Sequence, residues 1–192
     1  MYFVVSSVAW AEIRCTIAGR LNEDQARSSG VAVPMTYEWR FQAYLISTDR
    51  QRVDLSVVHQ FLSEESYWAK GRPYEVTCKA LDHSLCFGLY DPNGAQAGFA
   101  RAITDYATFA YIADLFVLTP HRGRGLGKWL VKTIIDHPEL QMVAKFRLRT
   151  RDAHGLYTQF GFTRLTRAEE HMVLSRLAVD PADEYSYADS QP

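Results

Sequence analysis

A glycine-rich turn between an apolar strand and an amphipathic helix constrains this sequence more than any other feature. The turn lies within residues 115–128, where Thr119-Pro120 ends the strand and Gly123, Gly125 and Gly127 alternate with other residues. Glycine has no Cβ, so successive backbone amides can turn toward a ligand without obstruction. The following helix adds unpaired N–H groups and the positive end of its dipole. The segment therefore predicts a pyrophosphate site.

Three basic side chains, Arg122, Arg124 and Lys128, place positive charge beside this turn. The whole chain of 192 residues has a formal net charge of −1, so the positive charge is local. Such a balance argues against a nucleic-acid surface or an anionic membrane as the main partner. Any phosphate recognition must therefore be local.

The turn differs from two common phosphate-binding motifs. A Walker A loop requires glycine and Ser/Thr where this chain has Arg122 and Trp129. A Rossmann fingerprint requires its last glycine where Lys128 stands, and it expects an early βαβ unit. A plain glycine-rich turn with no ligand stays open on the turn alone.

Arg122, Gly125 and Gly127 spell Arg-x-x-Gly-x-Gly, which resembles the acetyl-CoA loop of the GNAT superfamily of acetyltransferases. The resemblance implies that the loop amides hold the pyrophosphate of acetyl-CoA. It also implies that the preceding strand splays, so that its backbone pairs with the pantetheine arm. The cofactor-binding residues expected from it are Phe116, Val117, Arg122, Gly123, Arg124, Gly125, Leu126, Gly127 and Lys128.

A second motif follows at residues 153–162, which resemble the family's Ala-x-x-Leu-Tyr-x-x-x-Gly-Phe helix. The resemblance implies that Tyr157 lies near the cofactor sulfur and protonates the departing thiolate. A phenol with a pKa of about 10 is a suitable acid for a thiolate whose conjugate acid has a pKa of about 8.5. The sequence departs from the family at Thr150, where asparagine is common.

Asp114 is the candidate general base, because it stands in an apolar strand just before the cofactor segment. A carboxylate there is costly unless it is paired, faces the cleft or takes part in the reaction. The alternative role, binding a cationic acceptor or capping a backbone group, stays open.

Aromatic residues before and within the same strand are the candidate walls of the acceptor pocket. They are Tyr67, Trp68, Tyr106, Phe109 and Tyr111. An aromatic wall above Asp114 would suit an amine with an apolar or cationic body. Core packing accounts equally well for each aromatic residue taken singly.

The apolar periodicity predicts an α+β fold, a mixed and mostly antiparallel sheet flanked by helices. The resemblance implies that this is the GNAT-like acyl-CoA N-acyltransferase fold. Expected strands cover residues 41–46, 84–90, 95–103, 109–118, 143–150, 162–165 and 171–174. Expected helices cover residues 53–62, 125–136 and 152–160.

Composition along the chain predicts three parts. Residues 1–35 are expected to be a poorly ordered N-terminal extension and residues 177–192 an acidic flexible tail. Residues 36–176 between them are, by the resemblance, the expected GNAT acetyltransferase domain. One hypothesis is that Met35 is the true start of the protein and that the preceding segment is a variable or mis-assigned extension. The three cysteines have no metal-ligand spacing, and no apolar run approaches the ~20 residues that cross a bilayer. We therefore expect a cytoplasmic protein without a bound metal.

The leading functional hypothesis is an N-acetyltransferase that moves an acetyl group from acetyl-CoA to a primary amine of a small molecule. The acceptor is expected to attack directly in a ternary complex. Acetylation of a protein N-terminus or lysine is an alternative, and a non-catalytic acyl-CoA sensor is another. Homodimers are common in the resembled family, so a homodimer is possible.

Overall fold

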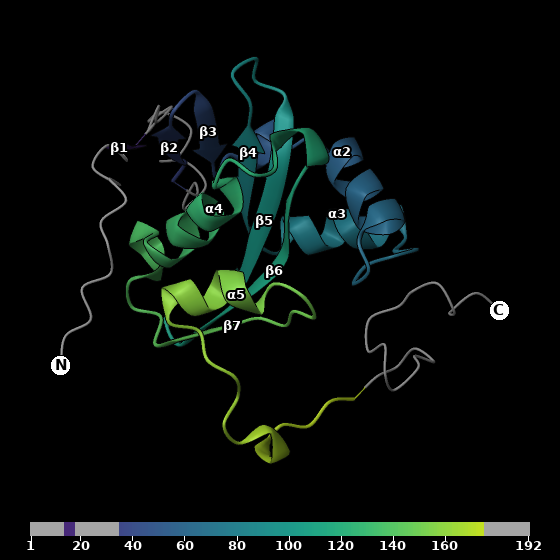
Figure 1. Ribbon diagram of the computed structural model, residues 1–192, viewed down its shortest axis with the longest axis vertical. Coiled ribbons are helices and arrows are strands. Elements are labelled where there is room, and N and C mark those ends of the chain that lie inside the picture. The colour runs from purple at the N-terminus through teal and green to yellow at the C-terminus, as the bar shows by residue number, and fades with distance from the viewer. Residues whose placement is uncertain (1–13, 18–34, 175–192) are drawn as a thin grey trace, which may run out of the picture.

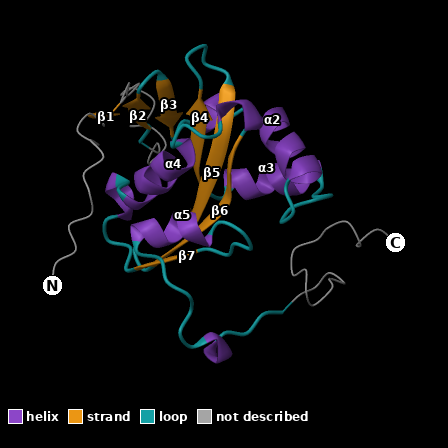
Figure 2. Cartoon of the chain, in the orientation of Figure 1, coloured by secondary structure: helices purple, strands orange, loops and turns teal. Residues whose placement is uncertain are grey.

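One seven-stranded sheet organises the part of the chain that the structure describes (Figures 1 and 2). The computed structural model describes residues 14–17 and 35–174. The strands are β1 (Arg14–Ile17), β2 (Tyr37–Phe41), β3 (Tyr44–Ser47), β4 (Leu85–Tyr90), β5 (Gln96–Thr104), β6 (Phe109–Val117) and β7 (Lys145–Arg147). They lie in chain order, and every neighbouring pair is antiparallel except β6 and β7. The expected mixed, mostly antiparallel sheet is confirmed.

The helices cover both faces of this sheet. They are α2 (Leu55–Gln60), a π-helical turn (Phe61–Glu65), α3 (Tyr74–Asp82), α4 (Leu126–Ile135) and α5 (His154–Tyr157). Short 3₁₀ turns cover Arg50–Arg52, Thr119–His121, Pro138–Leu140, Thr158–Phe160 and Ala168–Glu170. Figure 1 shows α2 and α3 together, across the sheet from α4.

Alternation along the strands divides the core between these two faces. Phe87 and Leu89 of β4 point into a cluster that includes Trp129 and Leu130 of α4. The side chain of Phe99 on β5 points to the opposite face of the sheet, where it packs against side chains of α2 and α3. Each face of the sheet is therefore fixed by its own buried helix contacts, which sets the register of the strands.

The first half of the sheet corrects one expectation. Residues 41–46 were expected to form a single strand, but β2 ends at Phe41 and β3 begins at Tyr44. Gln42 between them has a φ of 53°, the left-handed conformation that a tight turn requires. The strand-forming composition of this stretch hid a turn that carries no glycine or proline.

The end of the domain differs from the sequence-based expectation in two further strands. The strands expected at residues 162–165 and 171–174 do not form, and the segment holds only the 3₁₀ turn Ala168–Glu170. Leu165, Met172 and Leu174 are exposed, Met172 by 99%. These residues have no buried apolar face to hold them against β7, so their strand-like composition is not sufficient.

The terminal segments are described only in part. Residues 14–17 lie within the segment expected to be a poorly ordered extension, yet they form β1 and pair with β2. The remainder of that segment and the expected tail at residues 177–192 lie outside the described residues. None of the helices in the described part is long and apolar enough to span a bilayer.

The sheet opens between β6 and β7, and this opening positions the functional site. The two strands pair only from Phe109 opposite Lys145 to Tyr111 opposite Arg147. On its other edge β6 has a bulge, because its register against β5 shifts between Phe99 and Arg101. Asp114 lies in the bulge with a φ of 51°. Beyond Tyr111 the edge of β6 that faces away from β5 therefore has no partner strand within the described part of the chain.

His137, which follows α4, is buried in the core beneath aromatic rings. Its ring lies 4.7 Å from Tyr37 and 5.5 Å from both Trp39 and Phe87, measured between centroids. Nδ1 accepts a hydrogen bond from the amide of Glu139, whereas Nε2 is buried without a partner among the described residues. This burial lowers the pKa of His137 from 6.5 to about 4. The neutral ring is therefore part of the folded core.

This burial makes stability depend on pH. The unfolded chain binds a proton at His137 below pH 6.5, while the folded chain does so only near pH 4. The stabilisation that comes from the neutral His137 should thus be fully present above pH 6.5. As the pH falls from 6.5 to about 4, the free energy of unfolding should decrease by about 3 kcal/mol. Urea titrations at several pH values measure the fall. In His137→Gln, whose side chain cannot titrate, the free energy of unfolding should depend less steeply on pH than in the wild type. The same dependence on pH in both proteins would contradict the prediction.

Candidate active site

A groove runs along the open edge of β6 and past the glycine turn. It has a volume of about 570 Å³ and is lined by the end of β6, the turn, the start of α4, the π-helical turn and the start of α5. Phe116 is buried, with its ring stacked 3.9 Å from that of Phe61. Its backbone is therefore the part that can meet a ligand. We call this groove the cofactor groove.

The glycine turn has the geometry of an anion site. Gly123 and Gly125 have φ values of 77° and 78°, which other residues rarely adopt. A Cβ placed on Gly123, Gly125 or Gly127 would meet nothing within 4 Å, so the space in front of the turn is open. Gly125 precedes α4, and no side chain of the described residues caps this helix, so its first N–H groups are available. The turn fits a diphosphate.

Eight of the nine expected cofactor residues line the groove. Arg122 also donates from Nε to the carbonyl of Val117 at 2.8 Å, which ties the turn to the end of β6. Lys128 lines the groove, whereas Arg124 does not. Glu65, Ser66 and Phe61 line it too and were not expected. They come from a helical segment whose sequence contains no phosphate-binding pattern.

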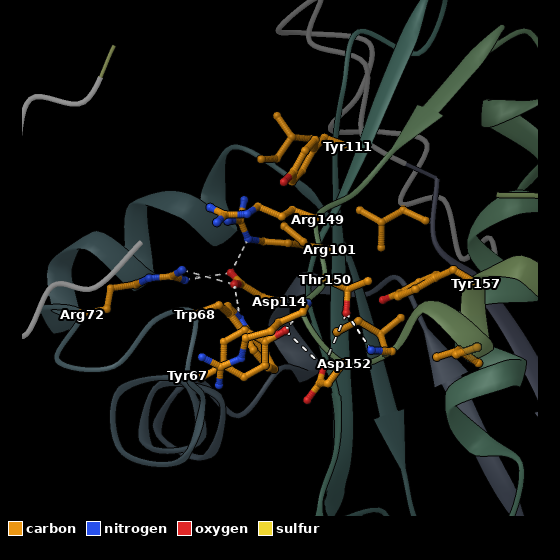
Figure 3. Close-up of a pocket in the computed structure, with 17 residues that line it drawn as sticks. Tyr67, Trp68, Arg72, Arg101, Tyr111, Asp114, Arg149, Thr150, Asp152 and Tyr157 are labelled. Carbon is orange, nitrogen blue, oxygen red and sulfur yellow. Dashed lines mark hydrogen bonds and ion pairs between the residues drawn. The ribbon is translucent and has the colours of Figure 1, made fainter. Parts of the chain in front are cut away.

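A second cavity opens beside the first, and we call it the acceptor cavity (Figure 3). Its volume is about 490 Å³. Five of the expected residues line it: Tyr67, Trp68, Tyr111, Asp114 and Tyr157. Segments far apart in the chain thus bring the expected catalytic pair and three of the five expected walls together.

The other two expected walls lie elsewhere. Tyr106 has a φ of 62° in the exposed turn between β5 and β6, and it lines neither cavity. Phe109 begins β6 and lies under the guanidinium of Arg147, which is 5.8 Å from the ring centroid. Both residues belong to the far end of the hairpin, so the structure does not bring them to the walls of the acceptor cavity.

Tyr157 is almost fully buried, and Figure 3 shows its hydroxyl directed toward Thr150 and the cavity. Burial raises the pKa of Tyr157 to about 12, with smaller contributions from Tyr67, Asp152 and Tyr111. The phenol is therefore protonated at neutral pH, as a proton donor must be. Ala153 and Leu156, which precede Tyr157 by four residues and by one, line both cavities. The phenol thus belongs to a helix that borders both cavities.

Asp114 is held by four N–H donors rather than left free (Figure 3). Arg72 donates from its two terminal nitrogens at 2.8 and 3.3 Å, Arg101 donates from Nε at 2.7 Å, and Trp68 donates from Nε1 at 3.2 Å. Burial alone would raise the pKa of Asp114, but the charges of Arg101 and Arg72 outweigh it and keep the pKa below 3.8. A carboxylate in this state is a weak base. The geometry favours the role of a fixed anion that orients two arginines.

Four arginines line the acceptor cavity, and sequence reasoning missed all of them. They are Arg72, Arg101, Arg149 and Arg151. Arg101 stands in an apolar strand, the same signal that identified Asp114. Arg147, Arg149 and Arg151 alternate at the period of a strand, so the pattern itself was visible in the sequence.

Asp152 joins the two cavities, since it lines both. Its carboxylate accepts from the hydroxyl of Tyr67 at 3.2 Å, and that hydroxyl accepts from the amide of Arg151 at 2.9 Å. The guanidinium of Arg151 lies 4.0 Å from the centroid of the Tyr67 ring. Thr150 accepts from the amide of Ala153 at 3.0 Å, which fixes the start of α5. These contacts hold the segment before α5 against Tyr67 on the opposite wall of the cavity.

Comparisons with known proteins bear on the family and the fold of this chain. The family profile described as the acetyltransferase (GNAT) family matches residues 35–162. A protein of Gibberella zeae, named provisionally as an acetyltransferase, is 32% identical over 114 residues. That match covers 50% of this chain and 64% of the relative, so the chain spans less than two thirds of the relative's length.

Solved structures show the same fold. A Xanthomonas campestris protein, described provisionally as a GNAT-family acetyltransferase, is 44% identical with a TM-score of 0.68. The match covers 71% of this chain and 95% of that one. A Deinococcus radiodurans protein is 23% identical with a TM-score of 0.55 over 71% of this chain and 92% of its own, and it supports the fold alone. With a family match across most of the domain, this chain belongs to the GNAT family of acetyltransferases.

Proposed function

We propose that this chain is an N-acetyltransferase that transfers the acetyl group of acetyl-CoA to a primary amine of a small molecule. The observation that carries the proposal is that the two cavities share part of their lining. Tyr67, Trp68, Leu115, Asp152, Ala153 and Leu156 belong to both. A donor in one cavity and an acceptor in the other would meet at this shared wall, beside Tyr157.

The residues of the cofactor groove fit acetyl-CoA. Open amides of the glycine turn, the start of α4 and the side chain of Lys128 suit its diphosphate. The unpaired edge of β6 suits its pantetheine arm, since a backbone edge without a partner strand can pair with amide groups. Bound there, acetyl-CoA supplies an activated acetyl thioester.

Direct attack by the acceptor is favoured over a covalent acetyl-enzyme. Neither cavity is lined by Cys78 or Cys86, the two cysteines whose side chains the structure describes. Burial also raises the pKa of Cys86 to about 12, so it carries almost no thiolate at neutral pH. Holding both reactants in adjoining cavities supplies much of the rate enhancement by itself.

The transfer is balanced with few protein groups. The acceptor nitrogen forms a bond to the acetyl carbon as the carbon–sulfur bond breaks, and the ammonium proton leaves to solvent. Backbone N–H groups on the unpaired edge of β6, near Phe116 and Val117, would polarise the thioester oxygen. Tyr157 donates its proton to the departing sulfur and regains one from the acceptor nitrogen, which loses a second proton as the amide forms. The weak basicity of Asp114 leaves water as the acceptor for the ammonium proton.

Turnover with a panel of amines tests the proposal. The purified chain is mixed with acetyl-CoA and each amine, free thiol is measured, and products are identified by mass spectrometry. We expect thiol release that depends on both the amine and the protein, with an added acetyl group on the amine. Saturable binding of acetyl-CoA with no thiol release from any acceptor would instead indicate a sensor. Release only with peptide or protein amines would move the assignment to protein acetylation.

A further inference from the structure

The charge of the acceptor cavity identifies a class of acceptor within the proposed function. We infer that the acceptor carries an anionic group, a carboxylate or a phosphate-type group, in addition to its amine. The inference rests on the proposed N-acetyltransferase function and adds the chemistry that the cavity selects. Of the apolar or cationic body expected from an aromatic wall above Asp114, it sets aside the cationic one.

Arginines outnumber acids around this cavity. Its charged lining residues are Arg72, Arg101, Arg149, Arg151, Asp114 and Asp152. The lining therefore holds four guanidinium groups and two carboxylates, an excess of two positive charges. Charges of one sign that line a cavity raise the local concentration of ligands with the opposite sign. A second cation on the acceptor would be repelled here.

Two of the four arginines are buried. Arg72 and Arg101 are each 8% exposed, and both bond the same oxygen of Asp114, at 2.8 and 2.7 Å. Arg101 also donates to the neutral hydroxyl of Ser84 at 3.0 Å. The single carboxylate of Asp114 is thus shared by two guanidinium groups, which leaves one positive charge of this cluster unbalanced. Planar guanidinium groups held in this way suit the paired oxygens of a carboxylate or phosphate.

Anion binding also fits the chemistry of transfer. The acceptor must attack as a neutral amine, and nearby positive charge lowers the pKa of an ammonium group. An anionic substituent on the same molecule offsets the repulsion, so that binding and deprotonation are both favoured. Tyr67, Trp68 and Tyr111 give the body of the acceptor an apolar wall. The volume of about 490 Å³ is that of a small-molecule site.

Three matched acceptors test the inference on the full chain with saturating acetyl-CoA. They are para-aminomethylbenzoate, para-aminomethylphenylphosphonate and para-aminomethylbenzamide, which share the amine and ring and differ in charge. We expect kcat/KM for at least one anion to exceed that for the neutral amide by about ten-fold or more, an effect on the order of 1.4 kcal/mol. The ranking of benzoate and phosphonate identifies which anionic group the cavity prefers.

A pair of variants locates the effect. Arg149→Gln removes a charge from an exposed arginine that lines the cavity, and should raise KM about ten-fold for the preferred anion and much less for the amide. Arg147→Gln is the matched control, because Arg147 lies two residues earlier, over the ring of Phe109, and does not line the cavity. It should leave all three acceptors unchanged.

The outcomes separate this inference from the proposed function. Equal turnover of the amide and both anions would overturn the inference and leave the N-acetyltransferase standing. A loss in Arg149→Gln that is equal for anions and amide would also overturn it, because the arginine would then act on the fold. Binding of acetyl-CoA with no turnover of any amine would reject the proposed function, and the inference with it.

Discussion

Gly125→Asp should weaken acetyl-CoA binding by about 100-fold or more, the largest effect on ligand affinity that we expect from one substitution. Gly125 precedes α4, lines the cofactor groove and has open space where a Cβ would stand. The new carboxylate would stand among the amides that are suited to the diphosphate. A loss of about 100-fold corresponds to about 2.8 kcal/mol, within reach of like-charge repulsion combined with the loss of charge-assisted hydrogen bonds.

Aspartate is chosen because the backbone tolerates it. The φ of 78° at Gly125 strains most side chains, whereas aspartate and asparagine visit the left-handed region more readily. Gly125→Asn then separates bulk from charge, since it has the same shape without the negative charge. Its affinity should fall less than that of Gly125→Asp. The difference between the two variants measures the electrostatic part.

Gly94→Asp is the control for strain. Gly94 has a φ of 83° in the turn between β4 and β5, meets nothing within 4 Å at a Cβ position and lines neither cavity. It therefore receives the same residue in nearly the same backbone conformation, away from the groove. Titration calorimetry with acetyl-CoA should give wild-type affinity for it. Wild-type affinity in Gly125→Asp as well would show that the diphosphate binds elsewhere.

The cofactor side of the site could be predicted because its signals are contiguous in sequence. Arg122, Gly125 and Gly127 lie close together in the chain, and the strand and helix on either side fix where their amides point. Tyr157 was found in the same way, from a motif on one short helix. Local backbone geometry determines how such a turn is presented, so one sequence is enough to predict which residues line the groove.

The acceptor side could not be predicted in the same way. Arg72 follows the π-helical turn, Arg101 lies on β5, and Arg149 and Arg151 follow β7. Only the folded sheet brings these elements together around Asp114. The sequence shows one buried acid in an apolar strand, but it does not show which cations surround it. The role expected of Asp114 therefore changed once its four donors were known.

Some elements of the fold could likewise be predicted from the sequence, and others could not. Strands with two covered faces, such as β4 and β5, were expected within one residue of their ends because burial fixes them. The turn at Gln42 and the absent strands after Gly161 were missed, since each depends on what the neighbouring chain covers. The short extent of β7 matters most for function. Its early departure from β6 creates the open edge of the cofactor groove.

Tyr157→Phe should lower kcat by about 100-fold while the affinity for acetyl-CoA stays near that of the wild type. General acid catalysis contributes about 100-fold or more when the donor is well placed. The pKa of about 12 makes the phenol a weaker acid than in water, which sets a limit on this contribution. The same dry environment, however, disfavours a free thiolate and raises the pKa of the leaving thiol as well. Removing the hydroxyl leaves that thiolate without its donor.

The raised pKa gives the prediction a second readout. Because Tyr157 keeps its proton until about pH 12, the kcat of the wild type should not decline near 10.0, the ordinary tyrosine pKa. Tyr106→Phe is the matched control, since Tyr106 lies in the exposed turn after β5 and lines neither cavity. Its kcat should equal that of the wild type. Stopped-flow measurement of thiol release isolates the chemical step, and an unchanged rate in Tyr157→Phe would mean that the sulfur leaves without this phenol.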